Sequence, residues 1–435
     1  MLKTIAVFDI GKTNKKILLF DLQMQLVHEV QTVFEEVKDD EGESCEDLHA
    51  LTAWMTETWQ TLQNDVRFDI TALNFATYGA SFVHLDAQGK PVTPLYNYLK
   101  NFPADYEKKF YNAYGDKDDI ATATASPVLG MLNSGLQLYW LKYAHPLVFK
   151  KISTSLHLPQ YCAYLFTQKK CSEYTSIGCH TALWDMQQND YHTWVKAEGI
   201  DTLFAPVTQN YTLGYTRYRD HEIPVGTGLH DSSAALIPYF KKNKQPFVLV
   251  STGTWSICLY PFAKSLLTKQ ELQKDCLNYM TFEGVKVKAS RLFLGHFHEV
   301  FTKIFAGHFV KDKDYYKNID FDADTYTKAL AMPAILNSST LPEQVFDATV
   351  LDSYTSYEQA YHRLMEDMVT YQYDALLMAT DGMSSVEKIF VDGGFNKNKI
   401  FMKLLSQKCN GVEVIAHDLS QGTSMGAAMV MLKNE

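Results

Sequence analysis

The stretch VFDIGKTNKKILLF at residues 7–20 decides the fold, because two apolar runs flank a short polar turn that contains glycine. Its Gly-Lys-Thr triplet matches the end of the P-loop pattern GxxxxGK[ST], but Ala6 stands where that pattern needs its first glycine. A P-loop also leads into a helix, whereas residues 17–20 (ILLF) are typical of a strand. We therefore predict a β-hairpin, whose exposed turn amides could still bind phosphate.

The same design recurs in the second half of the chain. Residues 247–260 (FVLVSTGTWSICLY) again run from an apolar strand through a short glycine turn into an apolar strand. The polar, proline-ended stretch 241–246 (KKNKQP) precedes it and is the best candidate for a domain boundary. We predict two related domains, residues 1–240 and 241–435, whose glycine turns face each other and grip a polyphosphate. The alternative is coincidence, because hairpins with glycine turns are common.

Composition limits the class of protein. The chain has 435 residues, enough for two or three domains, and its net charge of −10 without a long basic run argues against nucleic acid or an anionic membrane as the main partner. No apolar run approaches the roughly 18 residues of a membrane span, and no signal-peptide pattern opens the chain. The seven scattered cysteines favour a reducing cytoplasm over disulfides or zinc.

Four further segments predict elements that matter for the site. Residues 70–77 (ITALNFAT) favour a strand, and residues 355–358 (TSYE) favour a capping box that opens a long helix. Residues 388–399 (KIFVDGGFNKNK) predict a strand, an Asp-Gly-Gly turn and a helix, with a turn that a flat or anionic group can approach closely. Residues 422–432 predict a helix whose Gly426 lies on a small-residue face suited to close packing.

Two aspartates are candidates for chemistry. Phosphoryl transfer to a hydroxyl needs a carboxylate near Mg²⁺ and a carboxylate that accepts the proton of the acceptor. Asp9 ends the first predicted strand and is placed to hold the metal, through water. Asp231 lies in the segment PVGTGLHDSSAA and is placed to act as the base. An N-cap role for Asp231, ahead of Ser232, is the rival interpretation.

A set of motifs in consistent order resembles the FGGY family of carbohydrate kinases. They are DIGKTN, TYGASFVHLDAQGKPVTPLY, LQLYWLKYAHPLVFK, PVGTGLHDSSAA, STGTWS, VDGGFNKN and TSMGAAM, and they span Ile5 to Met431. The resemblance implies an α/β protein with two RNase H-like domains, the actin-like ATPase fold, and a nucleotide cleft between them. Trp255, the pair His230-Asp231, and Tyr78-Gly79 in place of a Gln-Met-His loop make it most similar to rhamnulose and fuculose kinases.

The resemblance also implies roles for individual residues. Asp231 becomes the proton acceptor, while Gly79, His230 and Ser232 line the sugar together with it. ATP phosphates contact Thr13, Asn14, Lys16, Gly253 and Thr254. The adenosine side is bordered by Gly393, Gly394 and Asn398. On polarity and position alone, Tyr78, Asn97 and Asn133 are added as further sugar contacts.

The departures from the family pattern concern the sugar. Lys16 stands where arginine is usual, Lys12 where Thr or Ala is usual, and residues 96–98 (YNY) where many members have a Trp-x-Asp stretch. We expect a cytoplasmic, ATP- and Mg²⁺-dependent kinase for a ketose such as L-rhamnulose or L-fuculose, with a homodimer left open. A pentulose or glycerol kinase, and an actin-like nucleotide-binding protein without kinase activity, are the alternatives.

Overall fold

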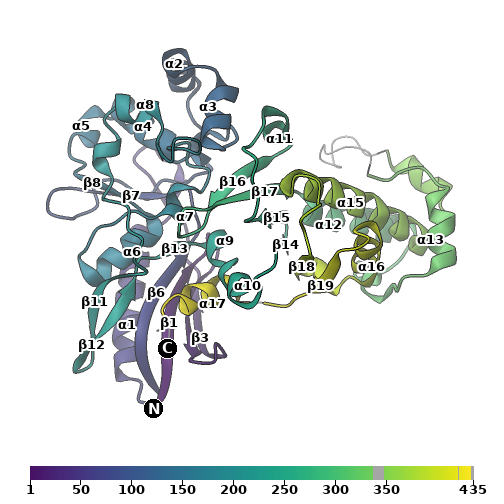
Figure 1. Cartoon of the computed structure of the whole chain (residues 1–435), viewed down its shortest axis with the longest axis horizontal. Helices are drawn as coiled ribbons and strands as arrows, with labels where there is room; N and C mark the ends of the chain where they lie inside the picture. Colours follow the sequence, from purple (N-terminus) through teal and green to yellow (C-terminus); the bar gives the residue numbers. More distant parts are fainter. Residues whose placement is uncertain (337–346, 420, 433–435) are drawn as a thin grey trace.

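The computed structural model describes residues 1–336, 347–419 and 421–432 of the chain. Two mixed β-sheets, one in each half, form its framework (Figure 1). The first sheet has the strand order β11 (Thr212–Tyr218), β12 (His221–Gly226), β6 (Phe68–Thr77), β1 (Leu2–Ile10), β2 (Lys15–Asp21) and β3 (Leu26–Thr32), with β13 (Leu229–His230) pairing with β6. The second has the order β16 (Cys276–Met280), β17 (Lys286–Leu292), β15 (Ser256–Tyr260), β14 (Phe247–Thr252), β18 (Lys388–Gly393) and β19 (Glu413–Ala416).

Both sheets follow one construction rule, which confirms the predicted internal repeat. In the first, β1 pairs antiparallel with β2 and parallel with β6. In the second, β14 pairs antiparallel with β15 and parallel with β18. The segment 7–20 is thus a hairpin, and the element after the Gly-Lys-Thr turn is a strand rather than the helix of a P-loop.

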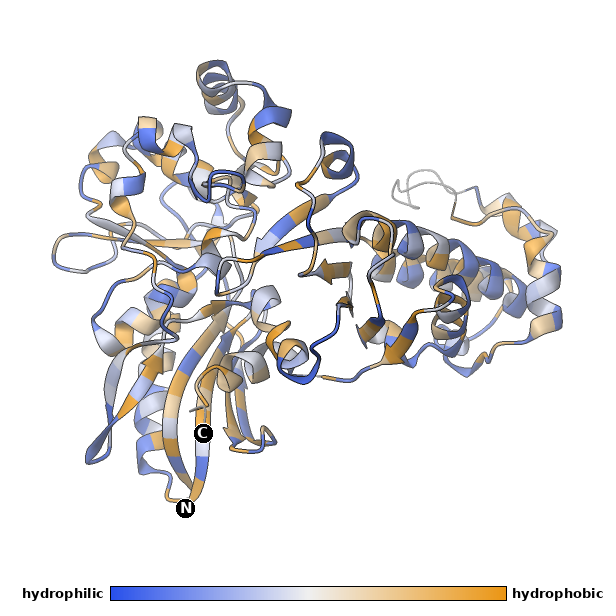
Figure 2. Cartoon of the chain, in the orientation of Figure 1, coloured by the Kyte–Doolittle hydropathy of each residue, from blue (hydrophilic) through white to orange (hydrophobic). Residues whose placement is uncertain are grey.

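Helices cover both faces of the first sheet, which explains why β1 is an almost continuous apolar run. Ala6 and Phe8 face α1 (Leu48–Asn64) and α6 (Leu158–Thr167). Ile5 and Val7 face the opposite way and pack with Ala428 of α17 (Gly422–Met429). Alternate residues of the strand therefore serve two separate cores, and Figure 2 shows apolar residues along β1 and β6.

The two faces of the second sheet pack against different parts of the molecule. Val248 and Val250 face a core with α12 (Leu294–His308), α15 (Tyr357–Ala379) and α16 (Lys399–Lys408), beside which lies α13 (Ala323–Leu330). Leu249 on the other face packs with Leu236 and with Tyr239 of α10 (Ile237–Lys242), which belong to the first half. The second half therefore packs on the first half through one face of its sheet (Figure 1).

The remaining elements form an α-rich region beside the first sheet. Its two-stranded antiparallel sheet pairs β7 (Phe82–Leu85) with β8 (Thr154–His157), and Trp194 and Tyr139 are buried in its core. The helices are α2 (Ala104–Tyr114), α3 (Lys117–Thr124), α4 (Gly135–Ala144), α5 (Pro146–Phe149), α7 (Tyr174–Ile177) and α8 (Thr193–Ala197), and α11 (Lys269–Gln273) follows β15. In the described part of the chain, no helix has the length and apolar character needed to span a membrane.

One local prediction is wrong by a residue. The long helix α15 is capped by Ser356, whose side chain accepts from the Gln359 amide, rather than by a box of Thr355 and Glu358. The Gln359 side chain instead accepts from the amide and the hydroxyl of Thr355, so the glutamine takes the part that was expected of Glu358. The predicted helix itself is present and runs for 23 residues.

The C-terminal helix α17 docks tightly on the first half because Gly426 has no side chain. A Cβ atom on Gly426 would lie 1.9 Å from the Ala234 carbonyl oxygen. We expect Gly426→Ala to lower the free energy of unfolding by about 1–3 kcal/mol, since the backbones must separate. Gly307→Ala on α12, where a Cβ would meet nothing within 4 Å, is the matched control and should be neutral or slightly stabilising. Equal urea midpoints for the two variants would contradict this packing argument.

Candidate active site

Three parallel strand ends bring the predicted acceptor-side residues together. In the register of the first sheet, Ile10 of β1 and His230 of β13 both pair with Thr77 of β6. Asp9, Gly79 and Asp231 therefore lie at the same carboxyl edge, although 222 residues separate the two aspartates in sequence (231 − 9). Such an edge is where ligands bind in open α/β sheets.

One carboxylate oxygen of Asp231 accepts hydrogen bonds, and the other is open. Its Oδ1 accepts from the Ser232 amide at 2.5 Å and from the Ser232 hydroxyl at 3.1 Å, and lies 3.1 Å from His230 Nε2. No donor to Oδ2 comes from the residues that the structure describes, and the side chain is 35% exposed. An N-cap aspartate would accept from amides two or three residues onward. Asp231 does not, so its carboxylate does not act as a helix cap.

Burial sets the protonation of this pair. It raises the pKa of Asp231 to about 6, despite the two hydrogen bonds from Ser232 that act in the opposite direction. It lowers the pKa of His230 to about 3, so the imidazole is neutral and carries a single ring proton. Because an ionised carboxylate can only accept, that proton belongs on Nε2, facing Asp231.

Asp9 is a second carboxylate at the same edge. Its Oδ2 accepts a hydrogen bond from the Ser424 hydroxyl of α17. Burial raises the pKa of Asp9 to about 6; the Ser424 hydrogen bond opposes this rise, and the negative charge of Asp231 adds to it. Lys16, opposite Asp9 in the hairpin, forms an ion pair of 2.8 Å with Glu29. Thr13 and Asn14 are exposed in the adjoining turn.

Gly79 is required by close packing behind the edge. A Cβ on Gly79 would lie 2.3 Å from Cys179 Sγ and 3.1 Å from His230 Cδ2. Cys179 Sγ is also 3.0 Å from His230 Nε2, and the Tyr279 ring stacks on the imidazole with centroids 5.4 Å apart. Sequence reasoning missed Cys179 and Tyr279, because neither belongs to a motif and each comes from a different part of the chain.

The structure gives other partners to three residues expected to contact the sugar. Tyr78 is buried and its hydroxyl donates to Glu46 at 3.3 Å. Asn97 accepts from the Leu99 amide and donates to a glutamate side chain. The Asn133 amide is fully used by three backbone groups, at 2.7, 2.8 and 2.9 Å, so we leave it out of the proposed site.

Tyr98 is a stronger candidate than Tyr78 or Asn97. Burial raises the pKa of the Tyr98 phenol; the charge of Lys12 opposes this rise, and the carboxylates of Asp231 and Glu46 add to it. Its ring packs against that of Tyr78 with centroids 5.9 Å apart. Because its ring packs on Tyr78, the neighbour of Gly79, Tyr98 is the member of the stretch 96–98 that we add to the candidate sugar contacts.

In the second sheet too, turns at the ends of neighbouring parallel strands lie together. Thr252 of β14 pairs with Gly393 of β18, and φ of Gly393 is +88°. A Cβ on Gly393 would lie 1.8 Å from the Thr252 carbonyl oxygen, so only glycine permits this approach. The Thr252 hydroxyl donates to the Asp392 carbonyl at 2.5 Å and accepts from the Phe395 amide at 3.0 Å, which joins the two turns.

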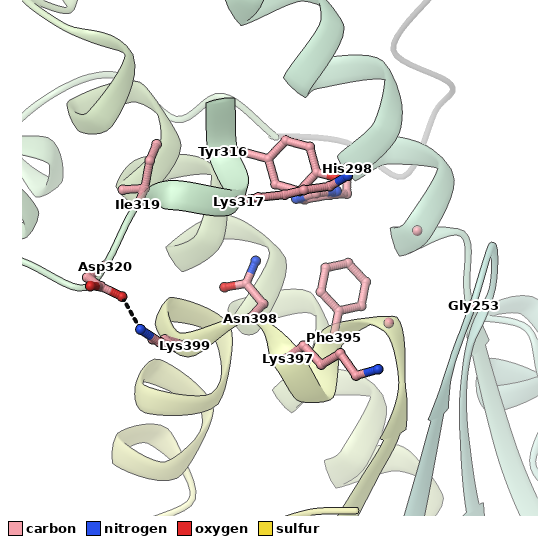
Figure 3. Close-up of a pocket in the computed structure, with 12 residues that line it drawn as sticks. Gly253, His298, Tyr316, Lys317, Ile319, Asp320, Phe395, Lys397, Asn398 and Lys399 are labelled. Carbon is pink, nitrogen blue, oxygen red and sulfur yellow. Dashed lines mark hydrogen bonds and ion pairs between the residues drawn. The ribbon is translucent and has the colours of Figure 1, made fainter. Parts of the chain in front are cut away.

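A cavity of about 480 Å³ opens beyond these turns and brings Gly253, Gly394 and Asn398 together (Figure 3). Its aromatic walls are Tyr316, His298 and Phe395, and an ion pair of 2.7 Å between Asp320 and Lys399 lies at one side. Such flat apolar surfaces suit a planar base. Asn398 caps α16 and donates to the Tyr361 hydroxyl, so its amide is already occupied. Thr254 and Gly393 border the turns without lining this cavity.

The donor set at Asp9 fits Mg²⁺. No group of three or more His, Cys, Asp or Glu that could enclose a metal occurs among residues 1–336, 347–419 and 421–432. Mg²⁺ keeps several waters and binds through one or two carboxylates together with substrate phosphates. The carboxylate of Asp9 therefore suits Mg²⁺. The partly desolvated Asp9, whose charge is opposed by that of Asp231, would be stabilised by a cation.

The two sheets and their facing strand ends define the class as an actin-like ATPase fold. The N-terminal domain model of the FGGY family of carbohydrate kinases matches residues 4–237, and the C-terminal FGGY carbohydrate kinase domain model matches residues 244–435. The chain therefore belongs to the FGGY family of carbohydrate kinases.

Relatives and solved structures agree with this assignment. The chain is 26% identical over 262 residues to a rhamnulokinase of Halalkalibacterium halodurans, covering 57% of this chain and 52% of that protein. It is 24% identical over 235 residues to a rhamnulokinase of Bacteroides thetaiotaomicron, covering 50% and 45%. The chain thus spans about half the length of these curated relatives. A carbohydrate kinase structure from Novosphingobium aromaticivorans shares the fold, with a TM-score of 0.80, 22% identity, and coverage of 98% of this chain and 93% of that one.

The open space at Gly394 gives a test of the aromatic cavity. A Cβ there would meet nothing within 4 Å, so a larger side chain can be added without a clash and would project into the cavity. We expect Gly394→Val to raise the KM for ATP at least tenfold, with a melting temperature within about 2 °C of the wild type. Gly307→Val on α12 is the matched control. An unchanged KM in the Gly394 variant would show that nucleotide does not enter this cavity.

The raised pKa of Asp231 predicts a pH-dependent cost in stability. Because the folded carboxyl holds its proton to about pH 6 whereas the unfolded one releases it near 3.8, folding stability falls as pH rises through this window. Asp231→Asn removes that cost, and we expect a gain of about 1 kcal/mol at pH 7.5 after allowance for solvent screening. At pH 4 the gain should vanish. Urea unfolding at both pH values measures it, and a loss of stability at pH 7.5 would contradict the argument.

Proposed function

We propose that the protein transfers the γ-phosphoryl group of ATP to a hydroxyl of a sugar. The observation that carries this proposal is the Asp231 carboxylate, which is oriented through Oδ1 and open at Oδ2. A carboxylate with a pKa near 6 is ionised at neutral pH and is more basic than an ordinary aspartate, as a general base needs. In this proposal Oδ2 accepts the proton of the acceptor hydroxyl as that oxygen attacks phosphorus.

The other residues of the edge orient the reactants. Neutral His230 donates to Asp231 and keeps the carboxylate in place, while Ser232 and Gly79 shape the floor beneath the sugar. In this proposal Lys16 and the amides of the turn at Thr13 and Asn14 bind phosphates, together with Gly253 and Thr254 of the second half. Mg²⁺ held near Asp9 would neutralise phosphate charge when bound. Closure of the two halves would exclude water and limit ATP hydrolysis.

A ketose is the substrate class that we favour, because both curated relatives reported above are named rhamnulokinases. L-Rhamnulose and L-fuculose are therefore the first candidates, and a pentulose or glycerol is the alternative. A non-catalytic actin-like nucleotide-binding protein is less well supported, because Asp231 does not cap a helix and has an open oxygen. A cytoplasmic location and a homodimer both stay predictions.

We also propose the domain boundary at residues 240/241. This boundary falls in the last turn of α10, which ends at Lys242, and a hydrophilic link leads from there to the start of β14 at Phe247 (Figure 2). The helix α17, however, returns to the first half and packs on β1 and β6. A domain defined by contacts would therefore combine residues 1–240 with the last helix.

Coupled ADP release against a sugar panel tests the proposed activity. The panel is L-rhamnulose, L-fuculose, D- and L-xylulose, D- and L-ribulose, and glycerol, each with Mg-ATP. We expect one sugar to give turnover that Asp231→Asn reduces by at least 10³-fold, with ATP affinity nearly unchanged, because only the proton acceptor is lost. Light scattering with ATP is the parallel assay for polymerisation. Polymer formation without turnover on any sugar would replace the kinase proposal with the non-catalytic one.

A further inference from the structure

We propose that Ser424, on the C-terminal helix α17, is a positioning residue that fixes the orientation of the Asp9 carboxylate for a divalent cation. This inference rests on the proposed role of Asp9 at the metal. Ser424 lies 415 residues from Asp9 in sequence, and its hydroxyl donates to Asp9 Oδ2. It is fully buried, and no other hydrogen-bond donor reaches the Asp9 side chain from the described residues.

The face of α17 that carries Ser424 is turned toward β1. One helical turn later on the same face, Ala428 packs in the core with Ile5 and Val7. Asp9 follows these two residues on the same side of the strand, because alternate residues share a face. The hydrogen bond is thus the polar end of an otherwise apolar contact between helix and strand.

Several contacts prevent α17 from shifting along β1. Asn74 Nδ2 donates to the Ala427 carbonyl at 2.8 Å, and Lys241 Nζ donates to the Met429 carbonyl at 2.7 Å. Close packing of Gly426 on the Ala234 carbonyl fixes the separation of the helices. The Thr423 hydroxyl donates to the Asp231 carbonyl at 3.4 Å. Adjacent residues of α17 therefore contact both carboxylate-bearing segments.

The Ser424 hydroxyl restricts the rotation of the Asp9 carboxylate. With Oδ2 engaged by Ser424, the carboxylate cannot rotate freely, and Oδ1 is the oxygen left for a hydrated cation. Loss of the hydroxyl would leave Oδ2 buried without a donor and release this rotation. Partners of metal-binding groups typically change metal affinity or activity by about 10–100-fold when they are removed.

The helix also connects the two halves. It follows a link in which the Leu419 amide donates to Asp392 Oδ1 at 3.2 Å, and the same oxygen accepts from the Gly393 amide at 2.8 Å. Asp392 thus joins the Gly393 turn, on the nucleotide side, to the segment that leads into Ser424. The cation site is therefore built by β1 and by a helix that arrives from the half with the aromatic cavity.

Binding of Mn²⁺ to the protein–ADP complex, followed by electron paramagnetic resonance, tests the inference. We expect Ser424→Ala to raise the Kd for Mn²⁺ at least tenfold, and Ser424→Cys, which keeps the size but donates weakly, to give an intermediate value. Binding of ADP without metal should change less than twofold. The matched control is Ser290→Ala, because Ser290 is equally buried and donates to the Ala375 carbonyl at 2.9 Å away from the carboxylates.

The variant Asp9→Ala distinguishes failure of the positioning role of Ser424 from failure of the metal site at Asp9. If this variant loses Mn²⁺ affinity while both Ser424 variants bind like the wild type, the positioning role is wrong and the metal site stands. If Asp9→Ala itself binds Mn²⁺ like the wild type, the proposed metal site fails. An equal loss in Ser290→Ala and Ser424→Ala would assign the effect to stability alone. Thermal melts of every variant identify any that fail to fold, and Ser424→Cys then decides the question.

Discussion

Burial of Asp9 and Asp231, two carboxyl groups at one edge of the first sheet, is the constraint on which the surrounding structure depends. Burial raises the pKa of each carboxyl group, and the charge of Asp231 further raises the pKa of Asp9. Each is steadied by a neighbouring hydroxyl, Ser424 for Asp9 and Ser232 for Asp231. In the proposed function, a cation held near Asp9 would offset the cost of its buried charge, which would favour binding of metal-nucleotide.

A buried polar network keeps the Asp231 segment rigid behind the edge. The carboxylate of Glu173 caps α7 through the amides of Thr175 and Ser176, at 2.6 and 2.7 Å. The Thr175 hydroxyl accepts from the His230 amide at 2.9 Å, directly before Asp231. Because every one of these groups is away from solvent, loss of one partner would leave another unsatisfied, so a change in the backbone position of Asp231 would be destabilising.

The two sheets use one design for different chemistry. In the first, the carboxyl ends of β1, β6 and β13 bring carboxylates and small residues together, and this is the proposed acceptor side. In the second, the ends of β14 and β18 present glycine turns beside the aromatic cavity. The helix α17 belongs to the second half by chain order and to the first by packing. The chain thus links the second half covalently to the helix that contacts Asp9.

The sequence by itself determined the hairpins, their repetition, and the glycine turns, because alternating apolar runs and turn residues are local signals. It also marked Asp9, near the end of a strand, Asp231, in the segment PVGTGLHDSSAA, and the small face of α17 at Gly426. Only the tertiary structure decided which side chains approach those carboxylates. Ser424, Cys179 and Tyr279 reach the site from distant segments through strand register and helix docking, and no local pattern records that proximity. Tyr78 and Asn133 look equally polar in sequence, yet packing gives their polar groups to Glu46 and to the backbone.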